Sequence, residues 1–461
     1  MPQHGDFVRT STGKRYYLYR PQHRLFDLDT TVWNAWLYRL TGVNPASTTF
    51  RYLTADCQTA ALQGKEMEVY RMAHWDGSFL RVSRFDGVVY RLDGQSIEAE
   101  NNGEGPVLFD DNQGWTPYEP DFSLNGTALE WWLNLANFTE FRDGYKLSLL
   151  AWILATFLTE LCPTRPLAVF DGEAGSGKSM TWRVLMRLLF GPTGEIGGVP
   201  DKPDGFTARA ANSHILVLDN LDDFTDWLRD KLARLCTGSE DHYRVLYSNN
   251  DLGTVRYRCW VAITSRTPDT LRRDDLADRV LLFPVTRIDD HWRLTENTFL
   301  TECLTRRSAW WGDVLTALNR VVATIRRDGI PANSTMRMAD FESLGRTIAK
   351  AEGHEDVWES VVNDWNNQQA DFLLQDSAVV DALDLWLQTP TNIWRQVTTR
   401  TLYSELESAL FGSNRPDASW PRSSYSFGRV LARLRRSLSS RFTVEWKEVN
   451  RHTYYRFGPK H

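Results

Sequence analysis

The order of apolar and polar positions changes several times along the chain. Residues 1–124 show short apolar runs separated by polar turns, and three of these turns contain Asp-Gly, at 76–77, 86–87 and 93–94. Asp-Gly favours tight hairpins because glycine adopts positive φ without steric cost. We predict a β-rich N-terminal domain here, with an antiparallel meander followed by a loop over 98–111.

The later segments alternate between helical and strand periodicity. The interval 125–163 has helical periodicity and is predicted to be a helical connector. Within 164–287 apolar strands alternate with helical stretches, which predicts an α/β core with a mostly parallel sheet. The interval 288–388 is predicted to be helical, and 389–461 to be a compact domain of helices that ends in two strands. The expected fold class is therefore α/β, with additional domains on either side of the core.

Charge is distributed unevenly along the chain. Residues 391–461 carry 13 basic and 5 acidic side chains, a net +8, whereas the other 390 residues carry a net −14. A basic end on an acidic body predicts contact with a polyanion. Five scattered cysteines fit a reducing compartment, so we expect a cytoplasmic protein. The longest apolar run, Leu149 to Leu158, is about half of a membrane span, so we expect no membrane association.

A phosphate-binding loop follows the first core strand. Leu167 to Phe170 is fully apolar, and a GxxxxGK[ST] pattern and a helical period come next. Such a loop turns backbone N–H groups towards phosphates, and the helix N-terminus adds positive potential there. We expect Lys178 to contact the β- and γ-phosphates of ATP and Ser179 to ligate Mg²⁺. The predicted nucleotide-binding residues are Gly172, Glu173, Ala174, Gly175, Ser176, Gly177, Lys178, Ser179 and Met180.

The second half of the expected site follows the next apolar strand, Ile215 to Leu218. Asp219 directly after it is predicted to hold Mg²⁺, alone or through water. Asn220 stands where ring ATPases mostly have a second acid that orients water; it can position water but cannot take its proton, and Asp222 or Asp223 could substitute. Thr264, after a third strand, is predicted to contact the γ-phosphate or the water.

An arginine-containing segment precedes the last apolar strand of the core, which begins at Val280. This is where ring ATPases present a finger to the neighbouring subunit's γ-phosphate, so we predict Arg279, with Arg273 as second choice, for that role. The alternative is that these arginines form salt bridges with the adjacent acids.

A strand–turn–strand pattern lies between the second and third core strands. Ring helicases carry a pore hairpin at this place, so we predict that Arg244, Arg256 and Arg258 lie near DNA. The turn over 249–253 has Asn and Asp in place of a basic tip. The alternative is a structural hairpin between subunits.

The basic end of the chain has the order helix, helix, wing. The second helix, Ser424 to Leu438, has one apolar face and arginines at i, i+4 and i+7 on the other. This order is typical of the winged helix-turn-helix, which places that second helix in a DNA major groove. A protein-docking winged helix is the alternative. The predicted nucleic-acid contacts are Arg422, Arg429, Arg433, Arg436, Lys447 and Arg451.

Taken together, these motifs resemble a known class of ATPase. The interval 164–287 resembles the core of phage- and plasmid-type replication helicases of the AAA+ and superfamily 3 group, especially those associated with primases in mobile elements. The stretches Leu218 to Leu221, Leu235 to Gly238 and Asp274 to Arg279 carry the likeness beyond the phosphate loop, and Arg337 to Phe341 resembles the group's helical lid. The resemblance implies a hexameric ring on single-stranded DNA, with a primase or polymerase as partner and 1–124 as an accessory collar.

Three functions are compatible with these residues. The first is an ATP-driven DNA helicase or translocase for replication of a mobile element. The second is a nucleic-acid-activated ATPase of antiphage defence. The third is a DNA-binding initiator that uses ATP to assemble and does not unwind DNA.

Overall fold

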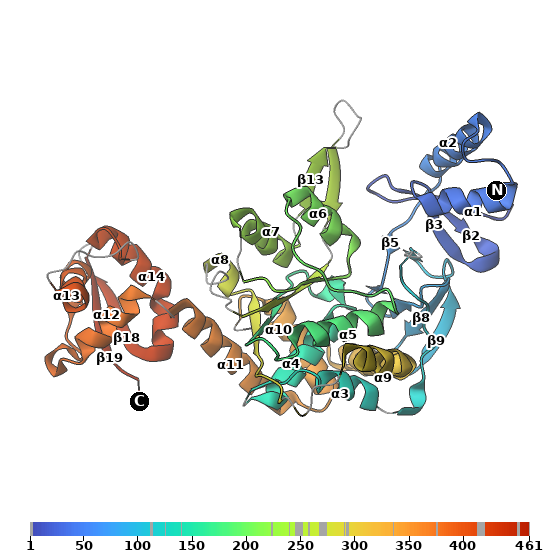
Figure 1. Cartoon of the computed structure of the whole chain (residues 1–461). Helices are drawn as coiled ribbons and strands as arrows, with labels where there is room; N and C mark the ends of the chain where they lie inside the picture. The colour runs from blue at the N-terminus through green and yellow to red at the C-terminus, as the bar shows by residue number, and fades with distance from the viewer. Residues whose placement is uncertain are drawn as a thin grey trace. The chain divides into compact units, whose positions relative to one another are not determined.

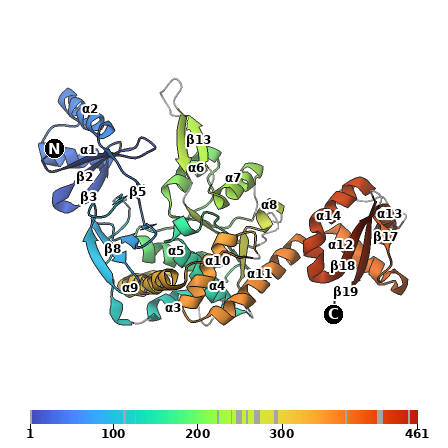
Figure 2. The ribbon, with the colours of Figure 1, turned by 180° about the vertical axis from the view of Figure 1, so that it is seen from behind.

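The computed structural model describes residues 3–110, 114–124, 126–139, 141–222, 225–238, 240–244, 252–256, 259–266, 274–289, 291, 295–334, 336–374, 377–412, 420–449 and 452–460. The chain forms two compact units. The first consists of Met1–Pro268 and Leu281–Val361, and the second of Asp269–Val280 and Val362–His461. Figures 1 and 2 show the elements of both units from opposite sides. Among the described residues, no helix is both long enough and apolar enough to cross a membrane.

The chain begins with a four-stranded sheet and two helices that cover it. The sheet has the order β3-β2-β1-β4, made of β1 (Gly5–Arg9), β2 (Arg15–Tyr19), β3 (Arg24–Asp27) and β4 (Lys65–Glu66). The helices are α1 (Thr31–Thr41) and α2 (Thr48–Leu62). Trp33 and Leu37 of α1 pack with Phe50 and Cys57 of α2 in one core. The prediction of a β-rich domain therefore missed two helices, whose buried residues follow the helical spacings i, i+4 and i, i+7.

The predicted antiparallel meander is confirmed. It consists of β6 (Ala73–Trp75), β7 (Leu80–Ser83), β8 (Val88–Leu92) and β9 (Ile97–Asn101), paired in chain order. Each Asp-Gly lies in a turn, and the three glycines have φ between 86° and 98°. The predicted loop over 98–111 is wrong in part. It contains most of β9 and all of β10 (Leu108–Phe109), which pairs with β5 (Val69–Tyr70). The residues of β9 are polar because that strand is only partly buried.

The parallel core sheet is confirmed and has the order β12-β15-β11-β16. Its strands are β11 (Leu167–Asp171), β12 (Ile215–Leu218), β15 (Trp260–Ser265) and β16 (Val280–Pro284). β15 pairs in parallel with both β11 and β12, which brings the carboxyl ends of these three strands to one edge. The helices of this part are α3 (Thr127–Leu133), α4 (Arg142–Ala155), α5 (Lys178–Phe190), α6 (Pro203–Asn212) and α7 (Asp226–Cys236).

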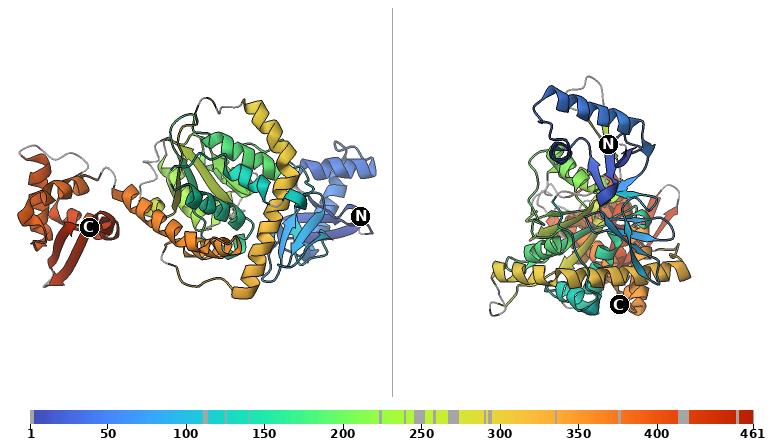
Figure 3. Two further views of the ribbon diagram at one scale, coloured as in Figure 1. Left: turned by 90° about the horizontal axis from the view of Figure 1, so that it is seen from below. Right: turned by 90° about the vertical axis from the view of Figure 1, so that its right-hand side faces the viewer.

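The predicted helical segment begins with the long helix α9 (Glu296–Asp328), which is seen lengthwise in Figure 3. α9 packs against α5 and also against the meander. The backbone N–H of Gly94 donates to Asn319 Oδ1 at 2.8 Å, and a Cβ on Gly94 would lie 2.7 Å from the Ala323 backbone. The meander is thus joined to the core. α10 (Ala339–Ala351) and α11 (Glu355–Leu374) follow α9.

The second unit contains the predicted helix–helix–wing arrangement. Its elements are α8 (Asp274–Ala277), α12 (Ala378–Leu387), β17 (Val397–Thr398), α13 (Thr399–Phe411), α14 (Ser424–Arg441), β18 (Phe442–Val449) and β19 (His452–Pro459). The sheet order is β17-β19-β18. Leu383 of α12, Leu402 of α13 and Leu434 of α14 belong to one buried core. α12 therefore packs with the wing region, although the sequence analysis placed it in 288–388, because its apolar face is covered by α13.

Candidate functional site

The loop between β11 and α5 has the backbone that a phosphate cradle requires. Gly175 and Gly177 have φ of 83° and 82°, in the left-handed region that glycine adopts freely. A Cβ on Gly172 would clash with the carbonyl oxygen of Val285, so this position also requires glycine. The loop ends at the N-terminus of α5, where unpaired N–H groups favour an anion. The predicted residues 172–179 therefore form a strand–loop–helix that is suited to phosphate.

Lys178 lies inside this loop with its ammonium group surrounded by oxygen atoms. Its Nζ donates to the carbonyl oxygens of Gly172 and of Glu173, the latter at 2.8 Å, and to Ser176 Oγ at 3.2 Å. Burial lowers the pKa of Lys178, while the nearby carboxylates of Asp171 and Asp222 oppose this shift. A partly desolvated cation held by neutral carbonyls fits a bound phosphate.

Ser179, Asp219 and Thr264 meet at the carboxyl edge of the sheet. Asp219 Oδ1 accepts hydrogen bonds from Ser179 Oγ at 2.6 Å and from Thr264 Oγ1 at 2.7 Å. The three residues come from α5, from the end of β12 and from β15, and parallel pairing of β12 with β15 aligns the last two. A hydroxyl and a carboxylate are ligands that Mg²⁺ prefers, so the Ser179–Asp219 pair fits this ion. The structure thus brings together the residues that the sequence predicted.

Asn220 occupies an unusual backbone conformation beside Asp219. Its φ is 54°, and its N–H donates to Thr264 Oγ1 at 2.9 Å. Its side-chain Nδ2 lies 3.4 Å from Asp219 Oδ2. Asparagine tolerates the left-handed region better than most residues other than glycine, which explains its presence in this turn.

Sequence reasoning missed Arg266, which directly follows β15. Its guanidinium binds Asp222 with Nε at 2.8 Å and Nη2 at 2.6 Å from Oδ2. Asp222, proposed as a substitute acid, is therefore paired in this structure, and Asp223 lies outside the described residues. An arginine after a core strand was the available signal, but its partner lies 44 positions earlier in the chain.

The two predicted arginine fingers lie before β16. Arg279 belongs to the second unit, is partly buried, and its backbone N–H donates to Leu276 O at 2.8 Å. Arg273 lies outside the described residues. The role of either residue in a neighbouring subunit stays a prediction.

The strand–turn–strand between β12 and β15 is an antiparallel hairpin of β13 (Glu240–Arg244) and β14 (Leu252–Arg256). Arg244 pairs in register with Leu252, and Arg256 with Glu240. Both strands start before the predicted positions. Arg258 and most of the expected tip lie outside the described residues.

Helix α14 presents basic residues on the face opposite its core. Arg422, Arg429 and Arg433 are exposed, whereas Phe427 and Leu431 are buried. Arg436 lies in α14, but its side chain is outside the described part, as is all of Arg451. Arg435 lies 3.9 Å from the Trp446 ring centre and donates to Tyr455 Oη at 2.9 Å, which ties α14 to the wing.

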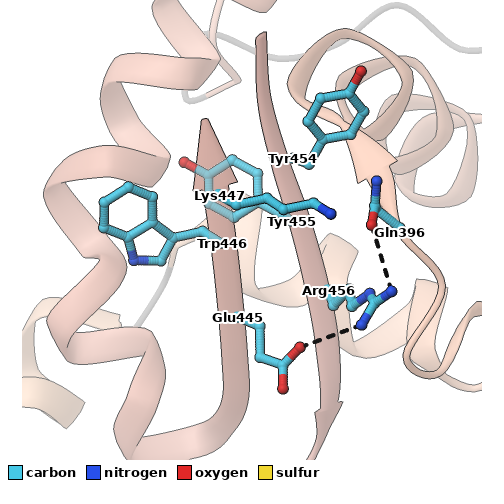
Figure 4. A pocket seen from close by; sticks show the side chains of 7 residues that line it. All are labelled: Gln396, Glu445, Trp446, Lys447, Tyr454, Tyr455 and Arg456. Atoms are coloured by element: carbon cyan, nitrogen blue, oxygen red, sulfur yellow. Dashed lines mark hydrogen bonds and ion pairs between the residues drawn. The ribbon is translucent and has the colours of Figure 1, made fainter. Parts of the chain in front are cut away.

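The wing carries a groove of about 310 Å³, adjoining solvent included, which Figure 4 shows. Lys447 pairs with Tyr454, and Glu445 with Arg456, across β18 and β19, so these four side chains share one face. Arg456 also contacts Gln396 at 3.4 Å and Glu445 at 3.7 Å. Lys447 thus lies beside an aromatic ring in the wing strand.

Residues 129–367 match the family described as "Actinomycete integrative conjugative element replication protein". This match covers more than half of the chain, from α3 to α11. The chain therefore belongs to that family of mobile-element replication proteins. A search among curated proteins finds no match.

Two solved structures give distant similarities. The apo structure of the NrS-1 C terminal region is 12% identical, with a TM-score of 0.46 over 100% of this chain and 97% of that one. A structure of JCV helicase is 13% identical, with a TM-score of 0.23 over 53% of this chain and 70% of that one. Both scores are below 0.5, so neither similarity supports an inference about function.

Proposed function

We propose that this replication protein is an ATP-dependent DNA helicase or translocase that acts as a ring on single-stranded DNA. The observation that carries the proposal is the convergence of Lys178, Ser179, Asp219 and Thr264 at the carboxyl edge of one parallel sheet. These are the parts that phosphoryl transfer from a nucleotide requires: a cation for the phosphates, oxygen ligands for Mg²⁺ and a polar group beside them.

Each residue has a distinct task in this proposal. The Lys178 ammonium exchanges its carbonyl partners for the β- and γ-phosphates, and Ser179 and Asp219 hold Mg²⁺, which neutralises charge that develops during transfer. Thr264 holds both neighbouring residues through its Oγ1, which donates to the Asp219 carboxylate and accepts from the Asn220 N–H. Asn220 orients the water, and Arg279 acts from an adjacent subunit.

The DNA contacts are proposed for two places. The β13–β14 hairpin, with Arg244 and Arg256, would contact a strand inside the ring, and the exposed arginines of α14 would contact DNA phosphates. We propose a homo-hexamer, with a primase or polymerase of the same element as a further partner. Membership of a replication family favours this role over antiphage defence.

The test is the ATPase rate with and without single-stranded DNA, with particle mass measured by light scattering. We expect stimulation by DNA and a hexamer-sized particle. Lys178→Ala should abolish turnover, because it removes the ammonium group proposed to contact the β- and γ-phosphates, and it should leave the fold intact. Lys65→Ala, an exposed lysine in β4, is the matched control.

Two results would contradict the proposal. Near-normal turnover by Lys178→Ala would remove the nucleotide-site assignment. If an assembled wild-type ring on DNA does not hydrolyse ATP, the helicase function is excluded. The remaining function is then that of a DNA-binding initiator that uses ATP only to assemble.

A further inference from the structure

The turn after β12 is joined to the end of β15 by a charged pair. Asp222 Oδ1 accepts from the Arg266 backbone N–H at 2.7 Å and from Ser265 Oγ at 3.2 Å. Asp222 Oδ2 accepts a hydrogen bond from Arg266 Nε at 2.8 Å and forms an ion pair with Nη2 at 2.6 Å. Three hydrogen bonds and one ion-pair contact thus hold the Asp222 carboxylate, and two of these four contacts come from the Arg266 guanidinium.

This pair lies at the edge of the nucleotide site. The Gly172 N–H, at the start of the phosphate loop, donates to the carbonyl oxygen of Ser265 at 3.3 Å, and Arg266 is the next residue in the chain. The charges of Asp222 and Arg266 also act on the Lys178 ammonium. The Arg266 side chain is 61% exposed, whereas that of Asp222 is 21% exposed. An arginine that reaches solvent beside a phosphate site is accessible to an incoming anion.

The ion pair is weak enough for Arg266 to exchange the Asp222 carboxylate for a phosphate group. Ion pairs with an exposed partner change an equilibrium by at most about fivefold, because water screens them and two side chains lose freedom. A terminal phosphate carries more charge than one carboxylate and matches the guanidinium with two parallel hydrogen bonds. Arg266 therefore has a better partner when a triphosphate is bound than when the site holds a diphosphate.

Among the described residues next to the expected magnesium position, Asn220 and Asp219 are poor acceptors for the water proton. Asn220 carries an amide, which takes no proton, and Asp219 Oδ1 already accepts from Ser179 and Thr264. Asp222 follows Asn220 by two residues on the same turn, and its carboxylate loses two donors when Arg266 leaves.

We propose that Asp222 and Arg266 form a latch that responds to the γ-phosphate. Arg266 moves to the terminal phosphate of bound ATP, and the released Asp222 carboxylate accepts a proton from the attacking water that Asn220 orients. The water oxygen bonds to the γ-phosphorus, the bond from this phosphorus to the bridging oxygen breaks, and ADP leaves with the electron pair. This inference rests on the ATPase function proposed above.

The experiment measures binding separately from hydrolysis. Wild type, Asp222→Asn, Arg266→Gln and the double variant are titrated with fluorescent ATP and ADP analogues, with Mg²⁺ and with EDTA. Asp222→Asn should bind ATP about two- to fivefold more tightly, because Arg266 no longer has a competing partner, and its affinity for ADP should be unchanged. Arg266→Gln should weaken the binding of ATP about tenfold and leave the binding of ADP unchanged. The double variant should behave like Arg266→Gln.

Single-turnover hydrolysis on the same proteins completes the test. The single-turnover rate of ATP hydrolysis should fall at least about 10²-fold in Asp222→Asn, because a positioned base usually contributes that much. Asp226→Asn removes a comparable partner of an arginine, Arg229 on α7, and should leave binding and hydrolysis unchanged.

Two outcomes would overturn the latch while leaving the ATPase proposal intact. One is wild-type single-turnover hydrolysis by Asp222→Asn. The other is that both single variants weaken the binding of ATP and of ADP equally, which is the result expected if the pair is purely structural. If the wild-type protein binds no ATP, the proposed function and the latch fall together.

Discussion

At the residue scale, Asn220 illustrates how backbone geometry limits the chemistry of the site. Its φ of 54° arises because the chain turns after β12 while the Asn220 N–H bonds to Thr264. A carboxylate side chain would place a second negative charge beside Asp219 in the same strained turn. The asparagine therefore satisfies the turn, and we assign the proton-accepting role to Asp222.

This interpretation predicts the effect of two substitutions on stability. Asn220→Gly should leave the free energy of unfolding within about 0.5 kcal/mol of wild type, because glycine adopts positive φ freely. Asn220→Val should lower it by roughly 1–2 kcal/mol, because a β-branched residue clashes in the left-handed region. Urea denaturation of both variants provides the measurement. Equal destabilisation by the two would show that the side-chain contact with Asp219 matters, and that the backbone conformation does not.

A second residue-scale prediction concerns His214, which precedes β12. Burial lowers its pKa to about 3, and its Nε2 has no hydrogen-bond partner among the described residues. Histidine in an unfolded chain has a pKa of about 6.5. Below that pH the unfolded chain takes up a proton that the folded protein excludes, so the stability that His214 contributes is present above pH 6.5 and lost as pH falls towards 3.

Between pH 6.5 and 5 this loss should amount to about 1.6 kcal/mol. His214→Gln should flatten the fall of the urea midpoint over that interval, whereas His354→Gln, at an exposed position, should not. A wild-type pH profile in the His214→Gln protein would show that other groups cause the acid sensitivity.

At the element scale, the sequence predicted those features whose signal is local. The bounds of β12, the phosphate loop and the Asp-Gly turns of the meander all follow from short contiguous patterns. α1 and α2 were missed because apolar residues on their other faces, such as Tyr38 and Leu40, obscure the period. The Arg266–Asp222 pair and the packing of α12 on α13 depend on contacts between distant segments, which no local pattern specifies.

The basic face of α14 gives a prediction about one element. Arg429→Ala should weaken DNA binding by a similar factor for every sequence, and the double Arg429→Ala, Arg433→Ala variant should reduce the salt slope by about two, because each phosphate contact contributes about one. Fluorescence anisotropy at several salt concentrations measures this slope. Arg441→Ala is the matched control in the same helix, since Arg441 pairs with Asp384 at 2.5 Å. An unchanged slope in the double variant would favour a protein-docking winged helix.

At the scale of the whole molecule, the family match and the compact units divide the chain differently. Residues 129–367 match the replication family, and they include the parallel core sheet, α9, α10 and the first part of α11. The meander before them is nevertheless joined to α9, and Arg71 donates to the carbonyl of Ala211 at the end of α6 at 2.8 Å. This N-terminal part is therefore joined to the core that contains the parallel sheet, and its role as an accessory collar stays a prediction.

The proposed ring predicts that each nucleotide site is completed by a residue of the neighbouring subunit. Arg279, directly before β16, is proposed to act on the neighbour's nucleotide, so the Arg279→Ala protein should bind ATP but not hydrolyse it. Mixing it with Lys178→Ala creates interfaces in which an intact Lys178 faces an intact Arg279. In a cyclic ring mixed at equal ratio, about a quarter of the interfaces have this composition, and hydrolysis should recover to about that fraction. Light scattering must show that both variants assemble. Absence of recovery at every ratio, with assembly intact, would mean that each site is completed by its own chain.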